Sequence, residues 1–171
     1  MDHNMINTPK QLKARFSYMF EGPNIGIDIA RGWMPGFQKL CEQIDELLGE
    51  DKRGFYWRQC KEKFGSARWY WSMKGGGQQP LRLDIISDAG VVETAFQSPK
   101  SNRPEDALYE RISELIDEAE SKTQRACIAC GEPGKGDPQG GYVLVLCEEH
   151  IRQRKNGKLP ELWFNEDESG Q

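Results

Sequence analysis

Two pairs of potential metal ligands constrain the fold of this chain more than any other feature of its sequence. Cys127 and Cys130 form a Cys-x-x-Cys pair, and after residues 131–146 the same spacing joins Cys147 to His150. Thiolate and imidazole groups are ligands that Zn²⁺ prefers, usually four of them in a tetrahedron. A set supplied entirely by the protein leaves no open position for a substrate. We therefore expect a structural Zn²⁺ ion rather than a catalytic one.

The residues around these ligands predict a small zinc-binding module. Residues 132–141 are rich in Gly and Pro, as hairpin loops often are, and residues 142–146 would form the return strand. Cys147 and His150 would share one face on the first turn of a helix. This order of turn, hairpin and helix start resembles a treble-clef zinc module. Structural zinc supplies about 10–16 kcal/mol of apparent binding energy, enough to fold a segment with almost no apolar core.

The remaining cysteines do not indicate disulfides. The chain has five Cys in total, and Cys41 and Cys60 lie within periodic segments where a buried thiol fits. An odd number of Cys used in this way is typical of a reducing compartment. The competing interpretation, three buried thiols and a surface histidine, leaves the two matched spacings unexplained.

The rest of the sequence predicts an α+β fold. Apolar residues recur at three- and four-residue spacing over residues 35–48 and 105–122, which predicts two amphipathic helices. Aromatic or branched residues alternate with polar ones in four shorter segments, which predicts strands at 55–60, 68–71, 81–85 and 91–96. Short connections favour an antiparallel sheet of about four strands, packed by the two helices. A C-terminal treble-clef-like zinc module completes the expected architecture.

Three regions follow from these assignments. The first would be an α+β domain with an N-terminal helical arm, whose short helix begins after Thr8. In the tail, residues 159–164 are apolar and should fold back on the core, whereas the acidic residues from Asn165 onward should be disordered. The expected α+β domain, zinc module and tail span residues 1–122, 123–158 and 159–171.

Composition limits the partners and the compartment. The net charge is −4, which argues against a protein that coats nucleic acid through bulk charge. No apolar stretch is long enough to cross a bilayer, and the polar first ten residues lack the apolar core of a signal peptide. We expect a cytoplasmic protein that does not associate with a membrane.

Two groups of basic residues predict a local nucleic-acid-binding surface. Basic and aromatic residues are interleaved between positions 58 and 71, and further basic residues follow the ligand pairs. The competing interpretation is a sheet with a buried aromatic face and a solvated charged face, together with ordinary charge at a helix end. We favour that interpretation for the first group. The residues concerned are Lys61, Lys63, Arg68, Arg152, Arg154 and Lys155.

The sequence contains few signs of catalysis. Only His3 and His150 are present, and His150 is assigned to zinc, so no nucleophile–histidine pair can be assembled. The glycines at 75–77 lack the Lys-Ser/Thr that follows in a phosphate-binding loop. Carboxylates are plentiful, but they lie on helix faces without a convergent setting. We expect a protein that is not an enzyme.

The order of several motifs resembles small uncharacterised proteins of bacteriophages and prophages. The residues that carry the resemblance lie between positions 32 and 150: Gly32-Trp33-Met34-Pro35, Leu40-Cys41, Ile44, Gln59-Cys60-Lys61-Glu62-Lys63-Phe64-Gly65, Arg68, Tyr70, Ala119-Glu120-Ser121 and the zinc motif. The resemblance implies an intracellular protein of a phage or a bacterium. It carries over no functional residues beyond the zinc ligands.

Our leading hypothesis is a non-enzymatic accessory protein that binds a host protein in the bacterial cytoplasm. A phage inhibitor of a host defence system such as CRISPR-Cas, an anti-CRISPR protein, fits the small size, the acidity and the lack of catalytic residues. One alternative is a nucleic-acid-binding regulator that uses the basic residues named above. Another is a metal-dependent nuclease, which would show turnover that a chelator abolishes without unfolding the protein.

Overall fold

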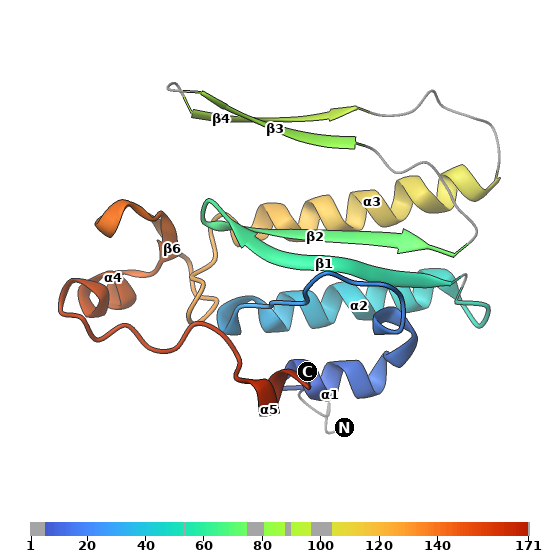
Figure 1. The fold of residues 1–171 in the computed structure, drawn as a ribbon, viewed down its shortest axis with the longest axis horizontal. Helices are drawn as coiled ribbons and strands as arrows, with labels where there is room; N and C mark the ends of the chain where they lie inside the picture. Colours follow the sequence, from blue (N-terminus) through green and yellow to red (C-terminus); the bar gives the residue numbers. More distant parts are fainter. Residues whose placement is uncertain (1–5, 53, 75–80, 88–89, 97–103, 171) are drawn as a thin grey trace.

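The computed structural model describes residues 6–52, 54–74, 81–87, 90–96 and 104–170 (Figure 1). The fold is α+β, with antiparallel strand pairs and several helices. In chain order the elements are α1 (Pro9–Arg15), η1 (Ser17–Phe20), η2 (Arg31–Trp33), α2 (Met34–Leu48), β1 (Phe55–Lys63), β2 (Ser66–Met73), β3 (Leu81–Ser87), β4 (Gly90–Phe96), α3 (Pro104–Thr123), β5 (Lys135–Asp137), η3 (Gln139–Gly141), β6 (Leu144–Leu146), α4 (Glu148–Lys155) and α5 (Glu166–Ser169).

The helices begin and end at local sequence signals. Thr8 caps α1, because its hydroxyl accepts a hydrogen bond from the Gln11 backbone N–H at 3.3 Å, and Pro9 occupies the first turn. Gly49 ends α2 with a φ of 65°, a conformation that residues with a Cβ rarely adopt. The predicted amphipathic stripe of α2 is confirmed at Phe37, Leu40, Cys41, Ile44 and Leu48, whereas Leu47, which was predicted to belong to it, is exposed.

The β1–β2 hairpin forms the centre of the body, which we define as residues 6–123. Its register pairs Lys63 with Ser66 and contains a bulge between Trp57 and Gln59. One face of the hairpin is aromatic and buried against the helices. The ring of Phe37, from α2, lies 5.0 Å from that of Trp57 and 4.8 Å from that of Trp69, centroid to centroid. These edge-on and tilted contacts are the favourable geometries for aromatic rings.

The expected four-stranded sheet is not formed by the described strands. β3 and β4 pair with each other as a separate antiparallel hairpin (Figure 1). At the outer edge of β2, the backbone N–H groups of Ala67 and Trp69 donate to Thr123 Oγ1 at 2.9 Å and Glu120 Oε1 at 2.6 Å. Both acceptors belong to α3. A further strand cannot pair at these positions, because side chains of the helix already occupy the edge.

The opposite edge of the hairpin is covered by the segment that precedes α2. Residues 25–28 run alongside β1 in parallel: Ile25 N–H donates to the Arg58 carbonyl, and Cys60 N–H donates to the Gly26 carbonyl, each at 2.9 Å. The hairpin is therefore protected on both sides by other parts of the chain.

The C-terminal segment is ordered through residue 170, which corrects the expectation of disorder from Asn165 onward. α5 begins with a capping box between Asn165 and Glu168. Arg31 anchors this segment, since its guanidinium contacts the Glu168 carboxylate at 2.6 Å, the Trp163 carbonyl at 3.0 Å and the Phe164 ring at 4.4 Å from the centroid. The predicted folding back of the apolar tail is confirmed, because Leu159, Leu162, Trp163 and Phe164 pack against the core.

The length and apolarity of the described helices show whether any of them could span a membrane. None of them is both long and apolar enough to span a bilayer.

Candidate metal centre

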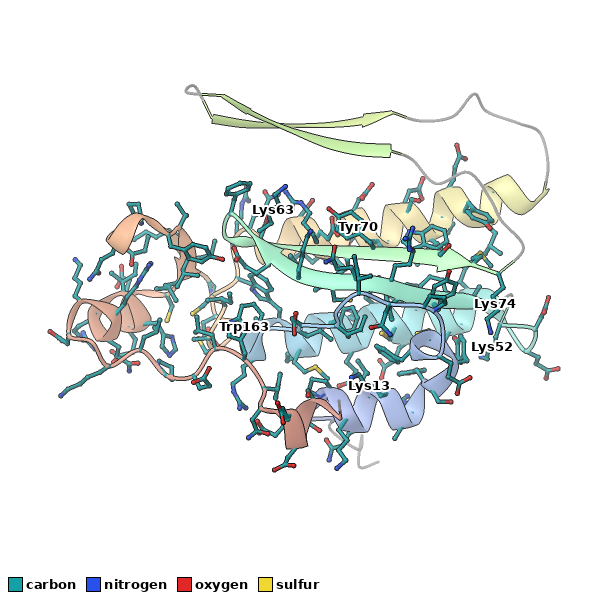
Figure 2. All side chains as sticks on the ribbon, viewed as in Figure 1. Lys13, Lys52, Lys63, Tyr70, Lys74 and Trp163 are labelled. Carbon is teal, nitrogen blue, oxygen red and sulfur yellow. The ribbon has the colours of Figure 1, made fainter. Side chains whose placement is uncertain are left out.

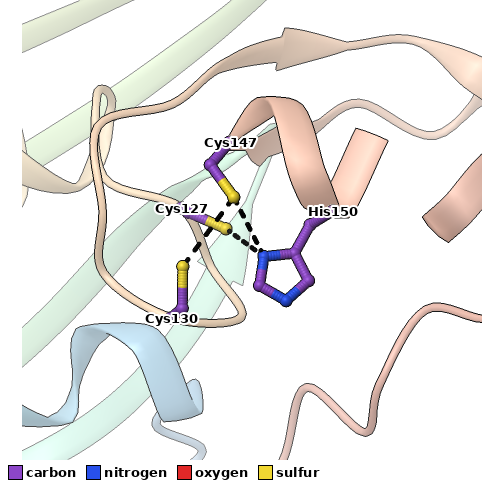
Figure 3. A group of neighbouring side chains, drawn as sticks. All are labelled: Cys127, Cys130, Cys147 and His150. Carbon is purple, nitrogen blue, oxygen red and sulfur yellow. Dashed lines mark hydrogen bonds between the residues drawn. The ribbon is translucent and has the colours of Figure 1, made fainter. Parts of the chain in front are cut away.

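Four side chains converge beyond the end of α3, in residues 124–158, which we call the metal module. The ligand atoms of Cys127, Cys130, Cys147 and His150 all lie within 4.8 Å of one another (Figure 3). His150 Nδ1 lies 3.3 Å from Cys127 Sγ and 3.1 Å from Cys147 Sγ. The Sγ atoms of Cys130 and Cys147 are 3.9 Å apart. The two pairs separated in sequence are thus brought to one point.

The first pair of ligands is shaped by a tight turn. Gly131 has a φ of 82°, a left-handed conformation, and its N–H donates to the Cys127 carbonyl at 2.7 Å. The Cys127 N–H in turn donates to the Glu132 carbonyl at 2.7 Å. These bonds fold the chain back on itself, so that both sulfur atoms point to the same side (Figure 3).

The second pair of ligands lies at the start of α4. Cys147 is the N-cap residue of this helix, and the Ile151 N–H donates to its carbonyl at 2.9 Å. His150 follows in the first turn, which places its ring beside the Cys147 sulfur. Strand β6 delivers Cys147 to this position, and β6 pairs with β5 in a short hairpin.

The spacing of the ligand atoms fits a tetrahedral metal ion. With Zn–S bonds of about 2.3 Å and Zn–N bonds of about 2.0–2.1 Å, a tetrahedron places two sulfurs about 3.8 Å apart and sulfur and nitrogen about 3.6 Å apart. The sulfur–sulfur separation of 3.9 Å matches the first value, the sulfur–nitrogen separations of 3.1 and 3.3 Å are shorter than the second by about 0.3–0.5 Å, and all four ligand atoms lie within 4.8 Å of one another. The cluster could therefore bind a metal ion.

The site is buried on one side and open on the other. Cys127 is fully buried, whereas Cys130 is exposed. Partial desolvation of the sulfur atom and the neighbouring thiols of Cys127 and Cys147 raise the pKa of the Cys130 thiol to about 11, against the lowering effect of a backbone hydrogen bond at Glu132. A metal ion binds the thiolate, so its uptake displaces this proton.

Arg154 holds the loop of the metal module in place. Its guanidinium pairs with the Asp137 carboxylate at 3.0 Å and donates to the carbonyls of Asp137, Gln139 and Tyr142 at 2.8, 2.5 and 2.7 Å. The side chains of Arg154 and Asp137 are only 13% and 11% exposed, so this pair is poorly screened by water. Arg154 was predicted to contact phosphate; in the structure both of its Nη groups bond to these acceptors of the module.

Gly32 joins the metal module to the body. Its N–H donates to the Ile128 carbonyl at 2.8 Å. A Cβ at this position would lie 2.2 Å from the Cys127 carbonyl oxygen and 2.6 Å from the Gly131 nitrogen. The backbone of η2 therefore touches the backbone of the ligand turn, an approach that only glycine permits.

The other basic residues predicted to bind nucleic acid are distributed over separate elements. Arg68 is buried, and its guanidinium donates to Ser66 Oγ at 2.8 Å and to the Ala67 carbonyl at 2.9 Å. Lys61 and Lys63 lie on β1, each with its Nζ 5.4 Å from an aromatic ring centroid, that of Tyr70 or Phe64. Arg152 and Lys155 lie on α4, where Arg152 pairs with Glu149.

Sequence reasoning missed the residues that support the ligands. Neither the Arg154–Asp137 pair nor the Gly32 contact has a local signal, because the partners are far apart in the chain. Cys41 and Cys60 are buried in the body and are not part of the ligand cluster, and burial raises the pKa of both thiols. In the part of the chain that the structure describes, the four predicted ligands are the one group of side chains arranged for a metal ion.

Comparison of the chain with protein-family models, with curated proteins and with solved structures found no match.

Proposed function

We propose that the chain is a non-enzymatic binding protein whose C-terminal module is stabilised by one structural Zn²⁺ ion. The observation that carries the proposal is the convergence of three Cys sulfurs and one His nitrogen within 4.8 Å. Three thiolates and one imidazole form a soft, four-coordinate set that suits zinc and disfavours Mg²⁺ or Ca²⁺. The turn, the β5–β6 hairpin and α4 follow one another in the order of a treble-clef-like module.

The absence of an open coordination position separates this site from a catalytic one. A catalytic zinc ion usually has three protein ligands and a water molecule, whereas four protein ligands are available here. His150 presents Nδ1 to the cluster, and it is the one histidine among the described residues. A nuclease of the treble-clef type would need a further, catalytic histidine beside the metal. The function of the ion is then to fix the turn at Cys127 and the start of α4 relative to each other.

The finer proposal is that the protein acts by binding a host protein in the bacterial cytoplasm, as a phage inhibitor of a defence system such as CRISPR-Cas would. The resemblance to phage and prophage proteins, the acidic composition and the lack of a catalytic constellation support this proposal. It predicts a stable, stoichiometric complex with one host protein. A nucleic-acid-binding regulator would instead bind with an affinity that falls steeply as salt is added.

The experiment has two parts. Elemental analysis of the purified chain should find one zinc per chain, and chelation should unfold the metal module rather than abolish a turnover. Affinity capture from bacterial lysate, with and without nuclease treatment, should retain one protein partner in both cases. Capture of nucleic-acid-binding proteins that disappears after nuclease treatment would contradict the protein-binding proposal. Chelator-sensitive hydrolysis of DNA or RNA by an otherwise folded protein would contradict the non-enzymatic one.

A further inference from the structure

The four ligands of the metal centre differ in their access to solvent. Cys127 is fully buried, Cys147 and His150 are half-buried, and Cys130 is exposed. Figure 2 shows α4 and its side chains at one end of the molecule, beyond the ends of β1 and β2. The centre therefore lies near the surface, and Cys130 is the ligand most open to water.

Cys130 also borders a cavity. The space has a volume of about 330 Å³ and lies between the start of α2, the end of α3 and the ligand turn. Its lining includes Trp33, Lys39, Lys122 and Glu132 beside Cys130. Hydrogen peroxide is much smaller than this space and is uncharged, so neither the lysines nor the glutamate would exclude it. A small oxidant can therefore reach Cys130 without unfolding of the protein.

Metal binding keeps the Cys130 sulfur in its reactive form. A metal ion binds a cysteine as the thiolate. The thiolate, rather than the thiol, reacts with oxidants, and its susceptibility increases with exposure. Cys130 should therefore react first among the three cysteine ligands. Cys41 and Cys60 should not react in the folded protein, because both are fully buried.

A second cysteine lies close enough to complete the oxidation. Cys147 Sγ is 3.9 Å from Cys130 Sγ, and a dashed line joins the two atoms in Figure 3. A disulfide bond is about 2.05 Å long, so the two sulfurs must approach each other by about 1.9 Å. The exposed side chain of Cys130 has room for this movement. Cys127 is a less suitable partner, because its sulfur is buried and its backbone N–H and carbonyl are both bonded within the turn.

We propose that the metal centre is a redox switch in which hydrogen peroxide oxidises Cys130 and Cys147 to a disulfide. In the first step the Cys130 thiolate attacks one oxygen atom of the peroxide, the O–O bond breaks, hydroxide leaves, and a sulfenic acid forms on Cys130. The Cys147 thiolate then attacks the Cys130 sulfur, an S–S bond forms, and a second hydroxide leaves. Two electrons pass from the two sulfurs to the peroxide. Two thiolates and one peroxide thus give one disulfide and two hydroxide ions.

The disulfide removes two of the four ligands. Cys127 and His150 alone hold a metal ion weakly, so the metal module should lose both its zinc and its order, while the body keeps its fold. A thiol reductant should reverse the change, because it reduces the disulfide by exchange. The inference rests on the proposed zinc site and adds a regulatory role to its structural one.

The test follows zinc release from the full-length, zinc-loaded chain in the presence of a chromogenic chelator. Hydrogen peroxide should release one zinc per chain, and peptide mapping should find a disulfide between Cys130 and Cys147, with Cys41 and Cys60 still reduced. A thiol reductant with added zinc should restore the starting state. Zinc that stays bound in excess peroxide, or a disulfide between Cys127 and Cys130, would overturn the inference.

Cys130→His separates metal binding from reactivity. The variant replaces the exposed thiolate by an imidazole and keeps four ligands that suit zinc. Peroxide should release its zinc more slowly than that of the unmodified chain, by about 10-fold, because the exposed nucleophile is gone. Cys60→Ala is the matched control, since this thiol lies outside the cluster, and its rate of zinc release should be unchanged. Equal rates for Cys130→His and the unmodified chain would contradict the role of Cys130.

A labelling experiment decides the matter without a variant. Iodoacetamide in limiting amount, added to the unmodified zinc-loaded chain, should modify Cys130 first, because it is the exposed thiolate. First modification at Cys127 or Cys147, or modification of all five cysteines together, would overturn the inference. If the chain binds zinc but peroxide does not release it, the switch fails and the proposed function stands. If the purified chain binds no zinc, both fail.

Discussion

The body and the metal module reach a fixed structure by different means. In the body, aromatic side chains fill the space between α2, α3 and the β1–β2 hairpin, and Trp57, Phe37 and Phe55 are almost completely buried. In the metal module, α4 buries no residue and the three-residue strand β5 buries only Asp137. Its apolar contribution comes from Ile128 and from β6, where Leu144 and Leu146 belong to the same core cluster as the body. A hydrophobic core stabilises the first region. The second region shares the edge of that core through Ile128 and β6, and it depends in addition on its ligand cluster and on the pair formed by Arg154 and Asp137.

This difference shows what a metal ion allows a short segment to do. Burial of apolar surface grows with chain length, so a segment of some 35 residues cannot form a sufficient core by itself. When four side chains bind one metal ion, the metal–ligand bonds supply folding free energy that a small core cannot. Loss of a ligand should therefore affect the metal module more than the body, and loss of an aromatic core residue should affect the body more than the module.

The largest effect is expected from Cys147→Ser. Loss of one ligand should abolish stoichiometric zinc binding and with it most of the about 10–16 kcal/mol of apparent binding energy that holds the module. Hydrogen exchange should show that the amides of Ile128 and Val145 lose protection, whereas those of β1 and β2 keep it. Cys60→Ala is the control, because this buried thiol is outside the cluster. Equal loss of protection in both regions would contradict the comparison.

Phe37→Ala perturbs the other region. The ring contacts Trp57 and Trp69 and is fully buried, so its removal should lower the free energy of unfolding of the body by about 3–5 kcal/mol. Chemical denaturation followed by tryptophan fluorescence measures this change. One equivalent of zinc should remain bound at temperatures where the variant is folded. Leu47→Ala, at a position that is 37% exposed, should cost far less. Loss of zinc from folded Phe37→Ala would show that the ligand cluster depends on the body core.

Arg154→Ala tests the polar support of the module. It leaves the Asp137 carboxylate without its partner and three carbonyls without a donor, which should cost about 2–3 kcal/mol. Competition with a chromogenic chelator should show faster zinc release. Arg152→Ala removes a pair whose side chains are 70% and 48% exposed, so its effect should stay within about 0.5 kcal/mol. Similar effects of the two variants would argue against a supporting role for Arg154.

The smallest effect concerns the junction of the two regions. Gly32→Ala places a methyl group against the backbone of the ligand turn and should cost about 1–3 kcal/mol, while zinc stays bound. Limited proteolysis between Thr123 and Cys127 should become faster as the module separates from η2. Gly36→Ala is the control, because a Cβ there meets open space within α2, and it should stabilise the helix by about 0.5–1 kcal/mol. Unchanged proteolysis in Gly32→Ala would show that the contact does not hold the module.

The sequence by itself determined the long helices, the strands of the β1–β2 hairpin and the four ligands. The three- and four-residue spacing of apolar residues predicts the buried stripe of α2, and the alternation of aromatic residues predicts the inner face of the β1–β2 hairpin. Both patterns involve residues close together in the chain, so they can be read from the sequence. The ligand set was predictable for the same reason: each pair has local spacing that only a turn or a helix start can satisfy.

Only the tertiary structure decided how these elements meet. Thr123 and Glu120 occupy the edge of β2, so β3 and β4 form their own hairpin, and no pattern within the strands announces that edge contact. Arg31 orders a tail whose composition alone indicates disorder. The basic residues Arg68 and Arg154 were assigned to the surface by charge, but each is bonded inside. In all these cases the deciding partner is a residue distant in sequence, and its contribution depends on a geometry that exists only after the chain has folded.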